Sequence, residues 1–193
     1  MNRALALLAL ALTLAACDAG PDVPAYDFDA PLPEASLYQV EAAWTSDAGT
    51  PAALADFRGT PVVLTMGYTS CGYACPMLVQ DMKKIASSLP EGTPARFVLV
   101  SMDPERDTPE ALRAFRAAHD LGDDWTLLTG SAADVRTLAA LLGVRYRPEA
   151  GGAIAHSNVI TVLDRDGVVA AQQEGLGADP GTAAAALQQA LGR

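Results

Sequence analysis

The stretch Gly67-Tyr68-Thr69-Ser70-Cys71-Gly72-Tyr73-Ala74-Cys75-Pro76 joins two segments with different hydrophobic patterns. Residues 62–66 before it form a short, largely apolar run, which is typical of a strand buried on both faces. After it, apolar residues from Leu78 to Leu89 recur at spacings of four, three and four, which marks one face of a helix. The stretch therefore predicts a buried strand that leads into a helix, with two cysteines at the junction.

Strands and helices alternate along the rest of the chain. Thr108-Pro109-Glu110 is typical of a helix start, because threonine caps the first turn, proline fits the first position and the acid faces the positive end of the helix dipole. Gly143 is typical of a helix end. Apolar runs predict strands over residues 97–100, 125–128 and 159–163, a turn at 164–167 leads to a further strand at 168–170, and apolar spacing predicts helices over 135–142 and 184–191.

This order of elements predicts an α/β domain with a thioredoxin-like fold. A central mixed sheet is flanked by helices, and its first half is parallel with right-handed crossovers. A weak alternation over residues 37–44 and a turn at 46–49 predict an added β-hairpin at the N-terminal side. A cysteine pair between a strand and a helix lies where the thioredoxin-like fold keeps its chemistry.

Composition limits the classes of function. The chain has 193 residues, enough for one well-buried domain, and 50% of them are hydrophobic, which excludes a disordered chain. It carries 13 basic and 23 acidic residues, a formal net charge of −10. Because nucleic-acid binding depends on neutralising phosphates, we expect no nucleic-acid partner.

The N-terminus is typical of an exported protein. A basic start is followed by an Ala/Leu run over residues 4–16, which is too short to span a bilayer as a helix. The run ends in Leu14-Ala15-Ala16-Cys17, which resembles a bacterial lipobox, so we expect a lipoprotein signal peptide over residues 1–16 and lipidation of Cys17. The expected location is the cell envelope, with a lipid anchor on the periplasmic face of the inner membrane.

Residues 17–35 are acidic, rich in proline and without periodicity, and predict a tether that lifts the domain off the membrane. The predicted domain covers residues 36–193. With Cys17 assigned to the lipid anchor, Cys71 and Cys75 remain as a pair.

The cysteine pair has two possible chemistries. At a helix start, free amides and the helix dipole lower the pKa of Cys71 and favour its thiolate. If both residues are helical, their Cβ atoms are about 5–6 Å apart, so that a disulfide forms with modest adjustment. Two thiolates equally bind a soft metal, Cu(I) or zinc. His156, after Gly151-Gly152 and before the strand at 159–163, is a candidate third ligand, with a structural histidine as the alternative.

The other histidine, His119, is predicted to be a surface residue at a helix end. It lies in Ala117-Ala118-His119-Asp120, after the helix that Thr108 is expected to cap. We therefore leave it out of the candidate site.

Several motifs together resemble the Sco/SenC family. Cys71-Gly72-Tyr73-Ala74-Cys75-Pro76 is similar to that family's CxxxCP signature, and residues 103–110, Asp-Pro-Glu-Arg-Asp-Thr-Pro-Glu, resemble another family motif almost letter for letter. The resemblance runs from about Leu37 to the C-terminus. Further similar segments, in matching order, are Trp44-Thr45, Asp56-Phe57-Arg58-Gly59, Leu127-Leu128-Thr129-Gly130-Ser131 and His156-Ser157.

The resemblance implies a membrane-anchored, copper-binding, thioredoxin-like domain with Cys71, Cys75 and His156 as ligands of a copper ion. It further implies a metallochaperone, rather than an enzyme, that assists assembly of the binuclear copper site of cytochrome c oxidase subunit II or serves another periplasmic copper protein. A copper donor and a thiol reductant are the other implied partners. The alternative is a thiol-disulfide reductase for that subunit's cysteines, with Cys71 and Cys75 as a redox pair that forms a disulfide when oxidised.

One position pair departs from the family pattern, which often has Pro and Asp after the first cysteine where this chain has Gly72 and Tyr73. The loss of an acid near the site affects the redox potential or the recognition of partners, and leaves the ligand set intact.

Two other functional classes fit less well. A general oxidoreductase of the thioredoxin type is expected to carry CxxC and a cis-proline before the strand at 159–163, and residues 155–158 contain no proline. A peroxidase is expected to show PxxxTxxC, and no proline stands at the required place before Cys71.

Overall fold

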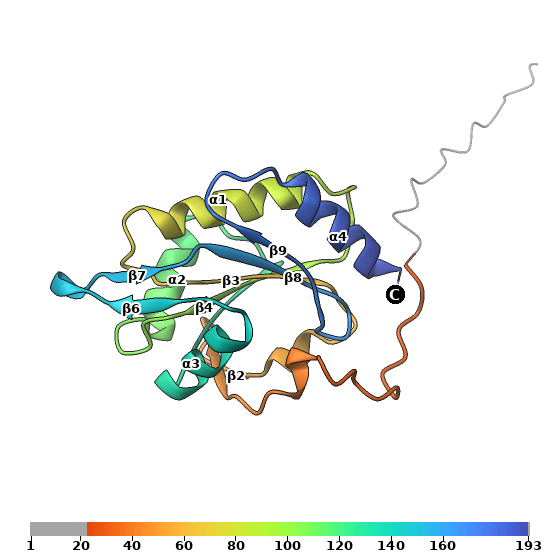
Figure 1. Cartoon of the computed structure of the whole chain (residues 1–193), viewed down its shortest axis with the longest axis horizontal. Coiled ribbons are helices and arrows are strands. Elements are labelled where there is room, and N and C mark those ends of the chain that lie inside the picture. The colour runs from red at the N-terminus through yellow and green to blue at the C-terminus, as the bar shows by residue number, and fades with distance from the viewer. Residues whose placement is uncertain (1–22, 193) are drawn as a thin grey trace, which may run out of the picture.

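The computed structural model describes residues 23–192, and within them a mixed sheet runs through the centre of the molecule (Figure 1). The strand order is β2-β1-β5-β4-β3-β8-β9. The strands are β1 (Trp44–Ser46), β2 (Pro51–Ala52), β3 (Val62–Gly67), β4 (Arg96–Ser101), β5 (Trp125–Gly130), β8 (Val159–Leu163) and β9 (Val169–Glu174). A separate hairpin pairs β6 (Tyr146–Pro148) with β7 (Ile154–His156).

Helices cover both faces of the sheet. The α-helices are α1 (Ala74–Ser87), α2 (Pro109–Ala118), α3 (Ala132–Leu141) and α4 (Gly181–Leu191), and short 3-10 helices cover Leu37–Gln39, Leu54–Phe57 and Ala150–Gly152. Buried side chains of α1, α2 and α4 form one apolar cluster with the sheet, and those of α3 and the N-terminal 3-10 helices form another. In Figure 1, α1 and α4 lie above the sheet and α3 lies below it. None of the helices between residues 23 and 192 is long and apolar enough to cross a membrane.

The predicted mixed α/β sheet is confirmed. Strands β3, β4 and β5 are parallel, whereas β8 runs antiparallel to β3 and forms a hairpin with β9. The added hairpin at the N-terminal side is β1–β2. Thr108 caps α2 as predicted, since its side chain accepts a hydrogen bond from the Ala111 amide and Pro109 holds the first helical position.

Two local expectations were wrong or incomplete. Residues 37–39 form a 3-10 helix rather than the start of a strand, because Ser36 Oγ accepts the Tyr38 amide and the Leu37 amide donates to the Gly167 carbonyl. The hairpin β6–β7 was not predicted. Its strands have only three residues each and face the solvent on one side, so they leave little hydrophobic pattern in the sequence.

The described part of the predicted tether contacts the domain. Tyr26 lies against the guanidinium groups of Arg58 and Arg165, and its hydroxyl bonds to the Asp166 carboxylate. These partners lie at the end of β3 and β8 that is opposite to Gly67 and His156. The predicted signal peptide, residues 1–16, and Cys17 lie outside the described residues.

Candidate metal centre

Cys75 lies in the protein interior, next to the carboxyl end of β3. Cys75 lies in the first turn of α1, is fully buried, and its Sγ accepts a hydrogen bond of 3.3 Å from the Tyr68 amide. A Cβ atom at Gly67 would lie 3.1 Å from this sulfur, tighter than ordinary van der Waals contact. Glycine at position 67 therefore makes room for the thiol where the strand ends.

Cys71 lies in the turn before α1, outside the helix. The condition under which the two cysteines would share a helix face is therefore not met, because α1 begins only at Ala74. The turn still gives Cys71 the benefit of a helix start, since its Sγ accepts a 3.3 Å hydrogen bond from the free amide of Cys75. Both cysteines are free thiols, Cys71 half-buried and Cys75 buried.

The pKa values of the two thiols are shifted in opposite directions. Burial raises the pKa of Cys71, but hydrogen bonds from the backbone amides of Cys75 and Tyr73 outweigh burial, and the net pKa is lowered. Burial is the main cause that raises the pKa of Cys75, and the neighbouring Cys71 adds to it. The pair therefore combines an accessible group that ionises readily with a buried group that holds its proton.

His156 reaches the cysteines from the last position of β7. Its Nε2 lies 3.9 Å from the Cys75 sulfur, and its Nδ1 lies 3.1 Å from the Ser157 carbonyl oxygen. Because a carbonyl only accepts, this contact places the proton on Nδ1 and leaves the Nε2 lone pair directed to the sulfurs. The imidazole is thus held in the tautomer that a metal ligand requires.

Tyr68 connects the cysteine turn to the histidine hairpin, a role that the sequence did not reveal. Its buried hydroxyl accepts a hydrogen bond from the Ile154 amide at 3.2 Å and donates to the Ile154 carbonyl at 3.3 Å. Its ring packs edge-on against the His156 ring, with the centroids 5.9 Å apart. One side chain next to the cysteine motif therefore holds the strand that carries the third candidate ligand.

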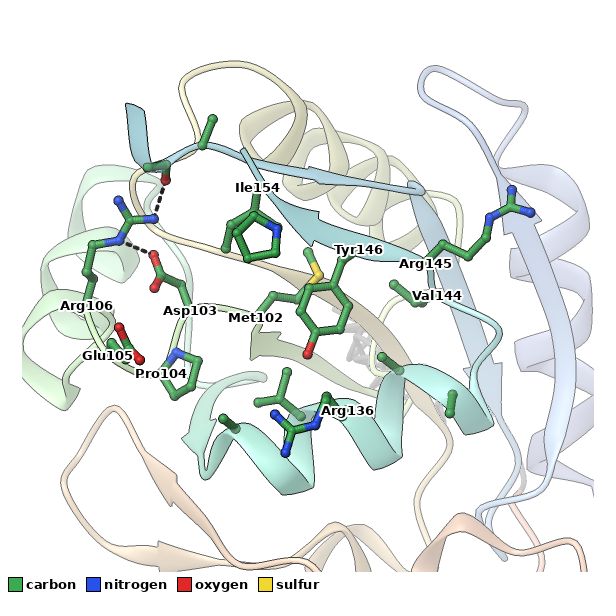
Figure 2. A pocket seen from close by; sticks show the side chains of 17 residues that line it. Met102, Asp103, Pro104, Glu105, Arg106, Arg136, Val144, Arg145, Tyr146 and Ile154 are labelled. Atoms are coloured by element: carbon green, nitrogen blue, oxygen red, sulfur yellow. Dashed lines mark hydrogen bonds and ion pairs between the residues drawn. The ribbon is translucent and has the colours of Figure 1, made fainter. Parts of the chain in front are cut away.

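The acidic motif at residues 103–110 also supports the centre. Asp107 is fully buried and accepts hydrogen bonds from the Thr69 amide, the Thr69 hydroxyl and the Ser101 hydroxyl at 2.6–3.0 Å. Arg106 bonds to the Asp103 carboxylate and to the Gly152 carbonyl at the hairpin tip (Figure 2). Asp107 thus holds the cysteine turn in place, and Arg106 holds the hairpin. The motif therefore does more than start helix α2.

The donor set fits a soft metal ion. The Sγ atoms of Cys71 and Cys75 and one ring nitrogen of His156 all lie within 4.8 Å of one another. Two thiolates and an imidazole are the donors that Cu(I) favours, whereas structural zinc requires four ligands. No other cluster of three or more His, Cys, Asp or Glu side chains in residues 23–192 is arranged to hold a metal.

The second histidine, His119, lies outside the candidate centre. His119 follows the last residue of α2, and its ring packs against Phe115 with a centroid distance of 4.1 Å, so it is half-buried rather than a free surface group. Tyr73 is 72% exposed beside the cysteines. The sequence missed Tyr68 and Arg106 as supporting residues, and the only signal for them was their place inside the two motifs.

Comparisons with known proteins agree with this arrangement. The model of the SCO1/SenC family matches residues 34–192. A Stutzerimonas stutzeri protein named for copper binding is 28% identical over 182 residues, which cover 86% of this chain and 84% of that protein. The SCO1 protein homologue of Bacillus subtilis is 26% identical over 145 residues, 72% of this chain and 75% of its own length.

Solved structures show the same fold. A SCO1/SenC family lipoprotein from Bacillus anthracis superposes with a TM-score of 0.71 at 24% identity, over 82% of this chain and 98% of its own. Copper-bound ScoI from Arabidopsis thaliana superposes with a TM-score of 0.66 at 21% identity, over 77% and 96%. The fold is therefore thioredoxin-like, as predicted, and with the family match over most of its length the chain belongs to the SCO1/SenC family.

Proposed function

We propose that the protein is a copper metallochaperone that binds one copper ion through Cys71, Cys75 and His156. The observation that carries the proposal is the convergence of these three donor atoms within 4.8 Å, on elements that are far apart in the sequence. Membership of the SCO1/SenC family and the copper-bound structures of similar proteins support copper as the metal. The proposed task is delivery of copper to the binuclear copper site of cytochrome c oxidase subunit II.

The geometry suits a carrier that must also release its cargo. Cys75 is buried, whereas Cys71 and His156 are each half-exposed, so an incoming ligand can replace the accessible donors first. Loading copper releases the thiol protons, and the lowered pKa of Cys71 reduces the cost of the first deprotonation. A disulfide between the cysteines abolishes the donor set, so copper loading requires a thiol reductant.

Thiol-disulfide reduction of the same client is the second candidate function. An accessible thiol with a lowered pKa next to a buried thiol is the arrangement of an attacking and a resolving cysteine. The Cys71 thiolate attacks one sulfur of a client disulfide and releases the other as a thiolate. Cys75 then loses its proton and displaces the client from the mixed disulfide. The client gains two electrons and the pair becomes a disulfide.

The proposed location is the periplasmic face of the inner membrane, through a lipid on Cys17. The support for it is the Ala/Leu run and the lipobox-like ending of residues 1–17. Mass spectrometry of the membrane-extracted protein tests it: a diacylglyceryl mass on an N-terminal peptide that begins at Cys17 is expected, and an unmodified Cys17 contradicts it.

Copper titration tests the carrier function. The reduced chain is loaded anaerobically with Cu(I) in competition with a chromogenic chelator, and His156→Ala is compared with His119→Ala as a matched control. One copper per chain is expected in the wild type and in His119→Ala, with markedly weaker binding in His156→Ala. Equal affinity in all three proteins rules out His156 as a ligand. Catalytic reduction of a subunit II disulfide by the copper-free protein favours the reductase function.

A further inference from the structure

A large pocket lies against the hairpin that carries His156. Its volume is about 950 Å³, and it lies between α3, the hairpin β6–β7 and residues 102–106 (Figure 2). Its apolar lining includes Met102, Val135, Val144 and Ile154. Apolar hollows of this size on a protein surface are typical of binding sites.

A smaller hollow lies on the hairpin beside the candidate third ligand. It has a volume of about 370 Å³ and is lined by His156 itself. Arg145 and Tyr146 line both hollows, and Tyr146 is the register partner of His156 across the hairpin. The two hollows therefore share lining residues on the hairpin, next to the candidate third ligand.

This surface carries unpaired positive charge. Arg136 on the exposed side of α3 and Arg145 before β6 line the large pocket, and neither guanidinium has a hydrogen-bond or ionic partner among residues 23–192. Glu105 lines the same pocket and likewise has no ionic partner among residues 23–192. The two free arginines outnumber this carboxylate, although the chain as a whole has a formal net charge of −10. They favour a ligand that presents carboxylates at the rim.

We propose that the two hollows form the docking surface for the protein that exchanges copper with Cys71, Cys75 and His156. The partner places an apolar side chain in the large pocket and sets carboxylates against Arg136 and Arg145. This inference rests on the proposed function, because it identifies the occupant as the copper-exchange partner.

The size of protein interfaces supports this occupant. Ile154 in the large pocket lies two residues from His156 on the same strand, a separation of about 7 Å. A standard interface covers about 800 Å² on each partner, a patch roughly 30 Å across, which is far wider than this separation. A partner that docks beside His156 therefore also contacts the pocket and its arginines.

The test measures association and copper transfer separately from copper affinity. The full chain, reduced and loaded with Cu(I), is mixed with the copper-binding domain of the host's cytochrome c oxidase subunit II. The variants are Arg136→Glu with Arg145→Glu, which reverses the charge, and Ala140→Trp, which fills the pocket from the exposed side of α3. The matched controls are Arg96→Glu, at the far end of β4, and Ala185→Trp, on the exposed side of α4.

Both pocket variants are expected to bind the subunit II domain about tenfold more weakly or worse, with slower copper transfer and unchanged Cu(I) affinity. The controls are expected to match the wild type, and added salt is expected to remove most of the difference caused by charge reversal. Association that is equal in variants and wild type overturns the docking surface, and so does the absence of any association. A wild type that fails to bind Cu(I) instead refutes the proposed function itself.

Discussion

The two parts of the candidate metal centre are built in different ways. The cysteine turn lies between a fully buried strand, β3, and a helix that is part of the main core. The hairpin that carries His156 is a two-stranded sheet with no buried residue in either strand. An isolated hairpin is marginally stable in water, so β6–β7 depends on its contacts with the rest of the domain. These contacts are the packing of Tyr146 and Ile154 against the core and the hydrogen bonds from Tyr68 and Arg106.

The two sides therefore differ in how firmly each holds its donor atoms. In the proposed carrier, the core fixes one thiol donor in place, and the hairpin supplies the imidazole that leaves when copper is released. We therefore expect changes on the cysteine side to abolish binding and changes on the hairpin side to weaken it by degrees.

The largest effect is expected for Cys75→Ser. A hydroxyl is a poor ligand for Cu(I), and the buried position leaves no room for another donor, so stable copper binding is lost. Chelator competition on the reduced chain measures it, with Cys17→Ser as the control that leaves Cys71 and Cys75 intact. Copper affinity near the wild-type value in Cys75→Ser would show that Cys71 and His156 are enough to bind copper. It would contradict the expected difference between the cysteine turn and the hairpin.

A smaller effect is expected for Tyr68→Phe, which leaves the ring against His156 and removes the hydroxyl. The Ile154 amide and carbonyl lose their partners, so the hairpin is held less firmly and Cu(I) affinity falls by about 10–100-fold. The free energy of unfolding decreases by about 1–3 kcal/mol. Urea denaturation and chelator competition measure the two quantities.

The control for Tyr68→Phe is Tyr73→Phe, because the Tyr73 side chain is exposed and its hydroxyl makes no hydrogen bond to another residue among 23–192. If Tyr68→Phe keeps wild-type copper affinity, the hairpin is positioned by other contacts and does not depend on this hydroxyl.

The smallest effect is a difference in pH dependence between the thiols of the copper-free protein. Cys71 has a lowered pKa, so iodoacetamide is expected to alkylate it first and at a pH below the ordinary cysteine value of about 8.5. Cys75 has a raised pKa, so it keeps its proton in the folded state while the unfolded chain ionises. The free energy of unfolding therefore decreases as pH rises above about 8.5.

Peptide mapping of the alkylated chain and urea denaturation between pH 7 and 10 measure these effects. Cys75→Ala is expected to flatten the decrease in stability at high pH. Alkylation of both cysteines at equal rates would contradict the assignment of an accessible and a buried thiol.

Elements whose signals are local could be predicted from the amino-acid sequence alone. The apolar run at residues 62–66 and the helical spacing from Leu78 determined β3 and α1 with the cysteines between them, and Thr108-Pro109 determined the start of α2. These features depend on side-chain periodicity and capping within a few residues, so they can be read without knowledge of the fold.

The way in which the candidate metal centre is closed depends on contacts between distant segments and could not be predicted. Cys75 and His156 are 81 residues apart, and their approach depends on the pairing of β3 with β8, the packing of Tyr68 under β7 and the bonds of Asp107 and Arg106. The sequence also did not show that α1 begins only at Ala74, so that Cys71 lies in a turn. Contacts between distant segments leave no periodic signal, because each side chain takes its role from a neighbour that only the folded chain supplies.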